Sequence, residues 1–96
     1  MTVFAILLPG PQPRVVEAIK HAYPNDFLSI TDIQWLISAN GTAIDVSAKL
    51  GIYDPKNPTV PPSGNAVIFA TSSYFGRAEA TIWDWLKTKL EASPSG

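Results

Sequence analysis

The sequence predicts an α+β domain in which a four-stranded antiparallel sheet is covered by helices on one face. Three observations lead to this prediction. Short apolar segments bounded by proline, glycine or asparagine alternate with segments whose apolar residues recur at helical spacing. The chain has 96 residues, enough to close one hydrophobic core but not two. Its composition, 46% hydrophobic and 16% charged, is that of a globular protein.

The first strand and helix are predicted within residues 3–23. Residues 3–8 are uninterrupted and apolar and are followed by Pro9, a pattern typical of a central strand covered on both faces. Residues 14–23, RVVEAIKHAY, carry apolar side chains at helical spacing. This helix should stop at Tyr23, because a residue before proline is disfavoured in helical conformation and Pro24 follows.

A hairpin and a second helix are expected next. Residues 27–30 and 33–39 are rich in branched and aromatic residues and are predicted as two strands joined by a turn. Thr42 and Asp45 have the spacing of a capping box, so a helix should begin after Thr42. Gly51 is a natural left-handed cap and should end it.

The last part of the chain is predicted as a loop, a strand and a helix. Residues 54–64 contain four prolines, which excludes both a helix and a central strand. Residues 66–71 form the fourth strand and 77–91 the third helix, with an apolar stripe wide enough to cover a sheet. Residues 1–91 are therefore expected to be one domain, and 92–96 a frayed tail.

The predicted element order, βαββαβ followed by a C-terminal helix, most simply gives a ferredoxin-like sandwich with strand order 4, 1, 3, 2. This order leaves the fourth strand at an edge, although its sequence AVIFA is apolar. An uncovered apolar edge invites pairing with another chain, so we expect protection by a homodimer, by the proline-rich loop or by the last helix. Val67 and Phe69 are candidate interface residues, as is Trp83, which lies just off the helical stripe.

Charge and cysteine content exclude several classes of protein. The formal charge is −1, and the seven basic residues are scattered among eight acids, which does not favour a dedicated nucleic-acid binder. No cysteine is present, so disulfides, thiolate nucleophiles and cysteine-ligated zinc are excluded.

The apolar start of the chain lacks a preceding basic segment and is too short for a signal core or a membrane span. We expect a soluble, cytoplasmic protein without a membrane partner.

Four segments resemble small proteins of the SinR family and, more remotely, the ferredoxin-like CRISPR adaptation proteins. They are EAIKHAY, IQWLISANGTAIDVSAKL, AVIFATSSYFGRA and WDWLKTKL. The resemblance implies a compact, often dimeric ferredoxin-like domain without a defined biochemical role. Nuclease-type relatives hold a divalent metal with an aspartate at the end of the first strand. Residues 7–11 read LLPGP here, so that metal site is not carried over.

The junction before the last helix is a candidate anion site. A helix N-terminus with serines, a glycine and an arginine has the physical ingredients for binding phosphate, but the same residues are typical of an ordinary helix cap. Capping is the preferred interpretation, because only one glycine and no adjacent lysine are present. The residues concerned are Ser72, Ser73, Gly76 and Arg77.

The leading functional hypothesis is a small, non-catalytic interaction or regulatory module without a cofactor. We expect it to be a homodimer, because its apolar edge strand needs a cover. No catalytic or metal-binding constellation is visible in the sequence. One alternative is a metal-dependent nuclease or nucleic-acid-binding protein, for which Asp26 and Asp32 are the acids expected to share one end of the hairpin. Another alternative is an anion or nucleotide sensor at the start of the last helix.

Overall fold

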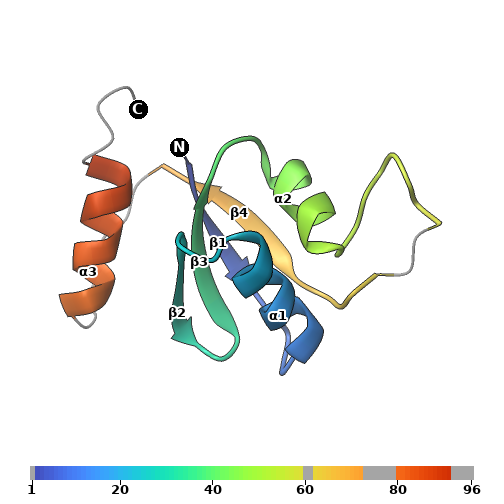
Figure 1. The fold of residues 1–96 in the computed structure, drawn as a ribbon, viewed down its shortest axis with the longest axis horizontal. Coiled ribbons are helices and arrows are strands. Elements are labelled where there is room, and N and C mark those ends of the chain that lie inside the picture. Colours follow the sequence, from blue (N-terminus) through green and yellow to red (C-terminus); the bar gives the residue numbers. More distant parts are fainter. Residues whose placement is uncertain (1, 60–61, 73–79, 92–96) are drawn as a thin grey trace.

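The computed structural model describes residues 2–59, 62–72 and 80–91 (Figure 1). Strand and helix bounds from residue 2 to residue 71 agree with the sequence-based prediction to within one residue. The last helix was predicted over 77–91, of which 77–79 lie outside the described part. The elements are β1 (Thr2–Leu7), α1 (Pro13–Ala22), β2 (Phe27–Thr31), β3 (Gln34–Ala39), α2 (Ala43–Leu50), β4 (Val67–Thr71) and α3 (Ala80–Leu86), which continues as a π-helical turn, η1 (Lys87–Glu91).

The four strands form one antiparallel sheet in the order β2-β3-β1-β4. Read from the other edge this is 4, 1, 3, 2, the order expected from the sequence. In the register of β1 with β3, Phe4 lies opposite Ile37. In the register of β1 with β4, Ala5 lies opposite Phe69. The two central strands are therefore β1 and β3, and β4 lies at an edge.

The main hydrophobic core lies between α1, α2 and one face of the sheet (Figure 1). Phe4 and Ile6 of β1 point to this face, as their spacing of two residues requires. Val15 and Ile19 of α1 and Val46 and Leu50 of α2 pack against them and are almost completely buried. These helical residues are spaced by four, which places each pair on one side of its helix.

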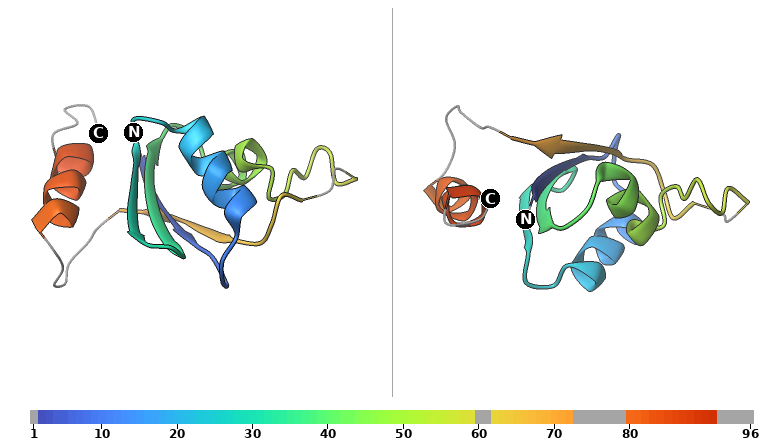
Figure 2. Two further views of the ribbon diagram at one scale, coloured as in Figure 1. Left: turned by 60° about the horizontal axis from the view of Figure 1, so that its bottom comes forward. Right: turned by 90° about the horizontal axis from the view of Figure 1, so that it is seen from above.

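The third helix lies on the opposite face of the sheet, so the prediction that all helices cover one face is wrong for α3. Figure 2 shows the sheet between α3 and the α1–α2 pair. A second cluster of buried residues, Val3, Leu36 and Leu86, joins α3 to β1 and β3. The physical reason is that the odd-numbered residues of β1 are apolar as well as the even-numbered ones. Both faces of this central strand must therefore be covered.

Local hydrogen bonds fix both ends of α2. The backbone N–H of Thr42 donates to Asp45 Oδ2 (2.8 Å), and the backbone N–H of Asp45 donates to Thr42 Oγ1 (3.3 Å). This reciprocal pair is the predicted capping box. Gly51 ends the helix with φ of 74°, a conformation that costs glycine little because it has no Cβ.

The proline-rich loop is hydrogen-bonded to the end of α2 near the loop's C-terminal end. Ser63 Oγ donates to the carbonyl of Leu50 (3.0 Å), and Ser63 N–H donates to the carbonyl of Gly51 (2.7 Å). Its described residues extend beyond α2, away from the sheet (Figure 1). Among the described residues, no helix is long and apolar enough to cross a bilayer.

Candidate interaction surface at the edge strand

Strand β4 leaves its outer edge open within the described part of the chain. In the sheet β4 pairs with β1 alone. At the end of the β1–β4 pairing, the hydroxyl of Thr71 donates a hydrogen bond to the carbonyl of Val3 (2.8 Å). The backbone groups on the other side of an edge strand remain available to a further strand. A partner could therefore extend the sheet at β4.

Three apolar side chains next to this edge are exposed on the α3 face of the sheet. Val67 is 55% exposed, Phe69 is 50% exposed and Leu7 is 42% exposed. Val67 lies opposite Leu7, and Phe69 lies opposite Ala5, so all of these residues belong to one face. We call Leu7, Val67 and Phe69 the open-face patch. The α3 cluster around Val3, Leu36 and Leu86 does not include these three residues.

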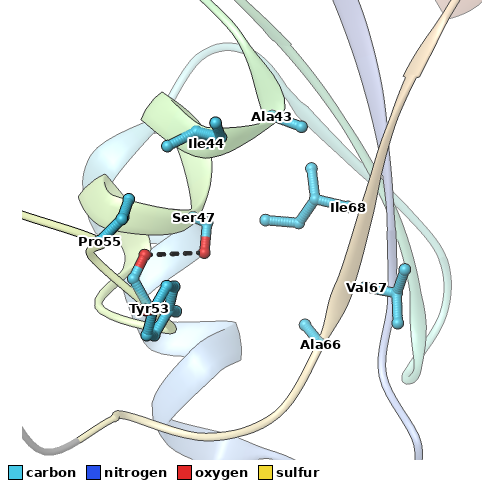
Figure 3. Close-up of a pocket in the computed structure, with 8 residues that line it drawn as sticks. All are labelled: Ala43, Ile44, Ser47, Tyr53, Pro55, Ala66, Val67 and Ile68. Atoms are coloured by element: carbon cyan, nitrogen blue, oxygen red, sulfur yellow. Dashed lines mark hydrogen bonds between the residues drawn. The ribbon is translucent and has the colours of Figure 1, made fainter. Parts of the chain in front are cut away.

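On the other face of β4 lies an apolar groove, which we call the α2–β4 groove (Figure 3). Ile68 points from β4 toward α2, whereas Val67 points away from the helix. The groove has a volume of about 450 Å³. Its lining residues are Ala43, Ile44, Ser47, Tyr53, Pro55, Ala66, Val67 and Ile68.

Most of this groove was not predicted from the sequence, although a signal was present. Ile44 lies off the helical stripe of Ala43, Val46 and Leu50, and an apolar residue outside such a stripe faces solvent. In the structure Ile44 is 61% exposed. Tyr53 could not be placed from the sequence, because its position depends on how the chain turns after α2.

A polar hollow lies between the end of α1, the end of β3 and helix α2, with Tyr23, Asp45 and Lys49 among its lining residues. Lys49 Nζ is 4.9 Å from the centre of the Tyr23 ring, within the range of a cation–π contact. Burial raises the pKa of the Tyr23 hydroxyl, and the charge of Asp45 raises this pKa further. Tyr23 is therefore a neutral phenol at pH 7, and the geometry favours packing of α1 on α2 over general base catalysis.

The two acids considered for a metal site are not brought together. Asp26 precedes β2 and Asp32 follows it, so they lie at opposite ends of this strand rather than at one end of the hairpin. Asp26 instead pairs with Lys89 Nζ at 2.6 Å. The carbonyl of Asp32 accepts a hydrogen bond from Trp35 Nε1. No group of three histidine, aspartate or glutamate side chains that could hold a metal occurs in the described ranges.

The remaining predicted site residues fall in different places. Ser72 directly follows β4 and is exposed. Ser73, Gly76 and Arg77, the other members of the candidate anion site, lie outside the described residues. Trp83, expected at an interface, is partly buried and packs against the cluster formed by Val3, Leu36 and Leu86. The structure thus places Val67 and Phe69 on an exposed surface, and Trp83 against the chain's own sheet.

Comparison of the chain with protein-family models, with curated proteins and with solved structures gave no match. The surface around β4 is therefore the feature of the molecule that bears on its function.

Proposed function

We propose that this chain is a non-catalytic protein-interaction module of ferredoxin-like topology that acts as a homodimer joined at β4. The observation that carries the proposal is the open outer edge of β4 beside the exposed side chains of Val67 and Phe69. Pairing of this edge with another strand satisfies its backbone groups and removes apolar surface from water, and both effects favour association. The resemblance to small SinR-family proteins, which are often dimeric, agrees with the proposal.

A second copy fits this edge because β4 is apolar on both faces. In antiparallel pairing about a two-fold axis at Phe69, each Phe69 lies opposite its own counterpart. Val67 then lies opposite Thr71 of the other copy. Such an interface is isologous and closes on itself, so it yields a dimer and not an open filament. The result is a continuous sheet of eight strands with the two open-face patches side by side.

The size of the particle in solution tests this proposal. Light scattering after gel filtration, at high micromolar concentration, should give twice the chain mass for the wild-type protein. Phe69→Lys should give the monomer mass, because two lysines would meet at the two-fold axis. Phe69 is half exposed, so the substitution should leave the monomer folded.

Ile33→Lys is the matched control, since Ile33 is an exposed isoleucine in the turn between β2 and β3, away from β4. This variant should remain dimeric. A wild-type protein that is monomeric at high micromolar concentration would contradict the proposal. A Phe69→Lys variant that remains dimeric would contradict it as well.

A further inference from the structure

We propose that the α2–β4 groove binds a small, uncharged and largely apolar molecule. This inference does not depend on the proposed dimer, because the groove is formed by elements of a single chain. It opens on the α1–α2 side of the sheet, toward which Ile68 points. Val67 also belongs to its lining, but the Val67 side chain points to the other side, where the open-face patch lies (Figure 3).

The chemistry of the lining defines the class of ligand. None of the eight lining residues carries a charge at neutral pH. Ile44 is 61% exposed and Tyr53 is 58% exposed, and Ile68 points from β4 into the space between them. A ligand that covers these side chains removes apolar surface from water. Two of the lining residues, Ser47 and Tyr53, carry hydroxyl groups, the kind of polar group that orients ligands in mainly apolar sites.

The walls of the groove are formed without a ligand. Ser47 Oγ donates to the carbonyl of Tyr53 (3.0 Å), which ties the turn after α2 to the helix (Figure 3). The opposite wall is strand β4, where Ile68 lies opposite Ile6 of the central strand. A preformed site costs a ligand little ordering of the protein, so a small contact area can produce measurable binding.

The size of the groove and the nearby charges narrow the choice of ligand. A volume of about 450 Å³ lies within the usual range of small-molecule sites. The carboxylates nearest in sequence to the lining are Asp45, next to Ile44, and Asp54, between Tyr53 and Pro55. Lys56 interacts with both acids and offsets only part of their charge. The lining itself holds no cation that could pair with an anion, so a bound carboxylate would lose its water without gaining a charged partner, which disfavours an anionic ligand relative to a neutral one.

A matched pair of probes tests the proposal. The ¹⁵N-labelled protein is titrated with 1-hexanol and, separately, with sodium hexanoate at the same pH and ionic strength. Hexanol should give saturable shifts at the amides of Ala43, Ile44 and Ile68. Hexanoate should bind several-fold more weakly, because it places a carboxylate among lining residues that carry no positive charge.

Variants locate the binding site. Ile44→Gln removes part of the apolar wall at an exposed position and should weaken hexanol binding about fivefold. Ile33→Gln makes the same chemical change outside the groove and should leave binding unchanged. Thermal melts of both variants check that the fold is retained. Phe69→Lys should retain hexanol binding, so failure of the groove can be told apart from failure of the dimer.

Three results would overturn the inference. They are the absence of saturable shifts with hexanol, equal binding of hexanol and hexanoate, and equal loss of binding in Ile44→Gln and Ile33→Gln.

Discussion

Thr42 and Asp45 show how two side chains begin a helix. Hydrogen bonds from the Thr42 backbone N–H and then from its hydroxyl lower the pKa of the Asp45 carboxyl. A carboxylate near a helix N-terminus is also favoured by the helix dipole. Because the folded-state pKa is lowered, the stabilisation is present at neutral pH and is lost as the pH falls through the folded-state pKa.

The capping box gives a prediction at this scale. Thr42→Ala should lower the free energy of unfolding by about 1 kcal/mol, because the N–H of Asp45 loses its acceptor. Urea denaturation followed by circular dichroism measures the change. Glu17→Ala is the control, since Glu17 is an exposed residue of α1, and it should change stability by less than about 0.5 kcal/mol. Equal stability of Thr42→Ala and wild type would show that the box does not stabilise α2.

Residues with a strong local signal were predictable, and those defined by distant contacts were not. The capping box and the left-handed Gly51 follow from the chemistry of a few neighbouring residues, so the sequence was sufficient to place both. The expectation that Asp26 and Asp32 share one end of the hairpin was wrong on local grounds, because the two residues flank β2 and therefore lie at its opposite ends. The pairing of Asp26 with Lys89, which lies 63 residues away in the chain, could not be predicted. The α2–β4 groove was missed for the same reason, since its walls meet only after the chain has folded.

At the level of elements, α3 differs most from expectation. An amphipathic stripe shows that a helix covers a surface but does not say which surface. The continuous apolar run of residues 3–8 was the available signal, because a strand apolar on both faces requires a cover on each. Leu86 of α3 packs against Val3 and Leu36 and so covers part of the second face.

The attachment of α3 should depend on Leu86 more than on the ion pair of Lys89. Leu86→Ala should lower the free energy of unfolding by about 2–3 kcal/mol, since Leu86 is a buried leucine. Lys89→Met should cost at most about 1 kcal/mol, because both partners of the pair are partly exposed. Urea denaturation of the two variants compares them. A larger loss for Lys89→Met would contradict this order.

At the level of the whole molecule, the proposal of an interaction module can be separated from the nuclease alternative. Asp26 is paired with Lys89, and Asp32 lies at the other end of β2. We therefore expect no cleavage of labelled RNA or DNA, single- or double-stranded, with magnesium or manganese. Cleavage that requires a divalent metal and is abolished in Asp26→Asn or Asp32→Asn would favour the nuclease.

The pairing of β1 with β4 also has a consequence for synthesis of the chain on the ribosome. β1 can pair with β3 once residue 39 has emerged from the ribosome. The pairing of β1 with β4 has to wait longer, because Thr71, the partner of Val3 in β4, is synthesised 68 residues after Val3. Until then one side of β1 is itself an unprotected edge. β4, in the second half of the chain, therefore covers the exposed edge of β1, in the first half. A ribosome that stalls before β4 is made would release a fragment in which this edge is open and which is prone to aggregation.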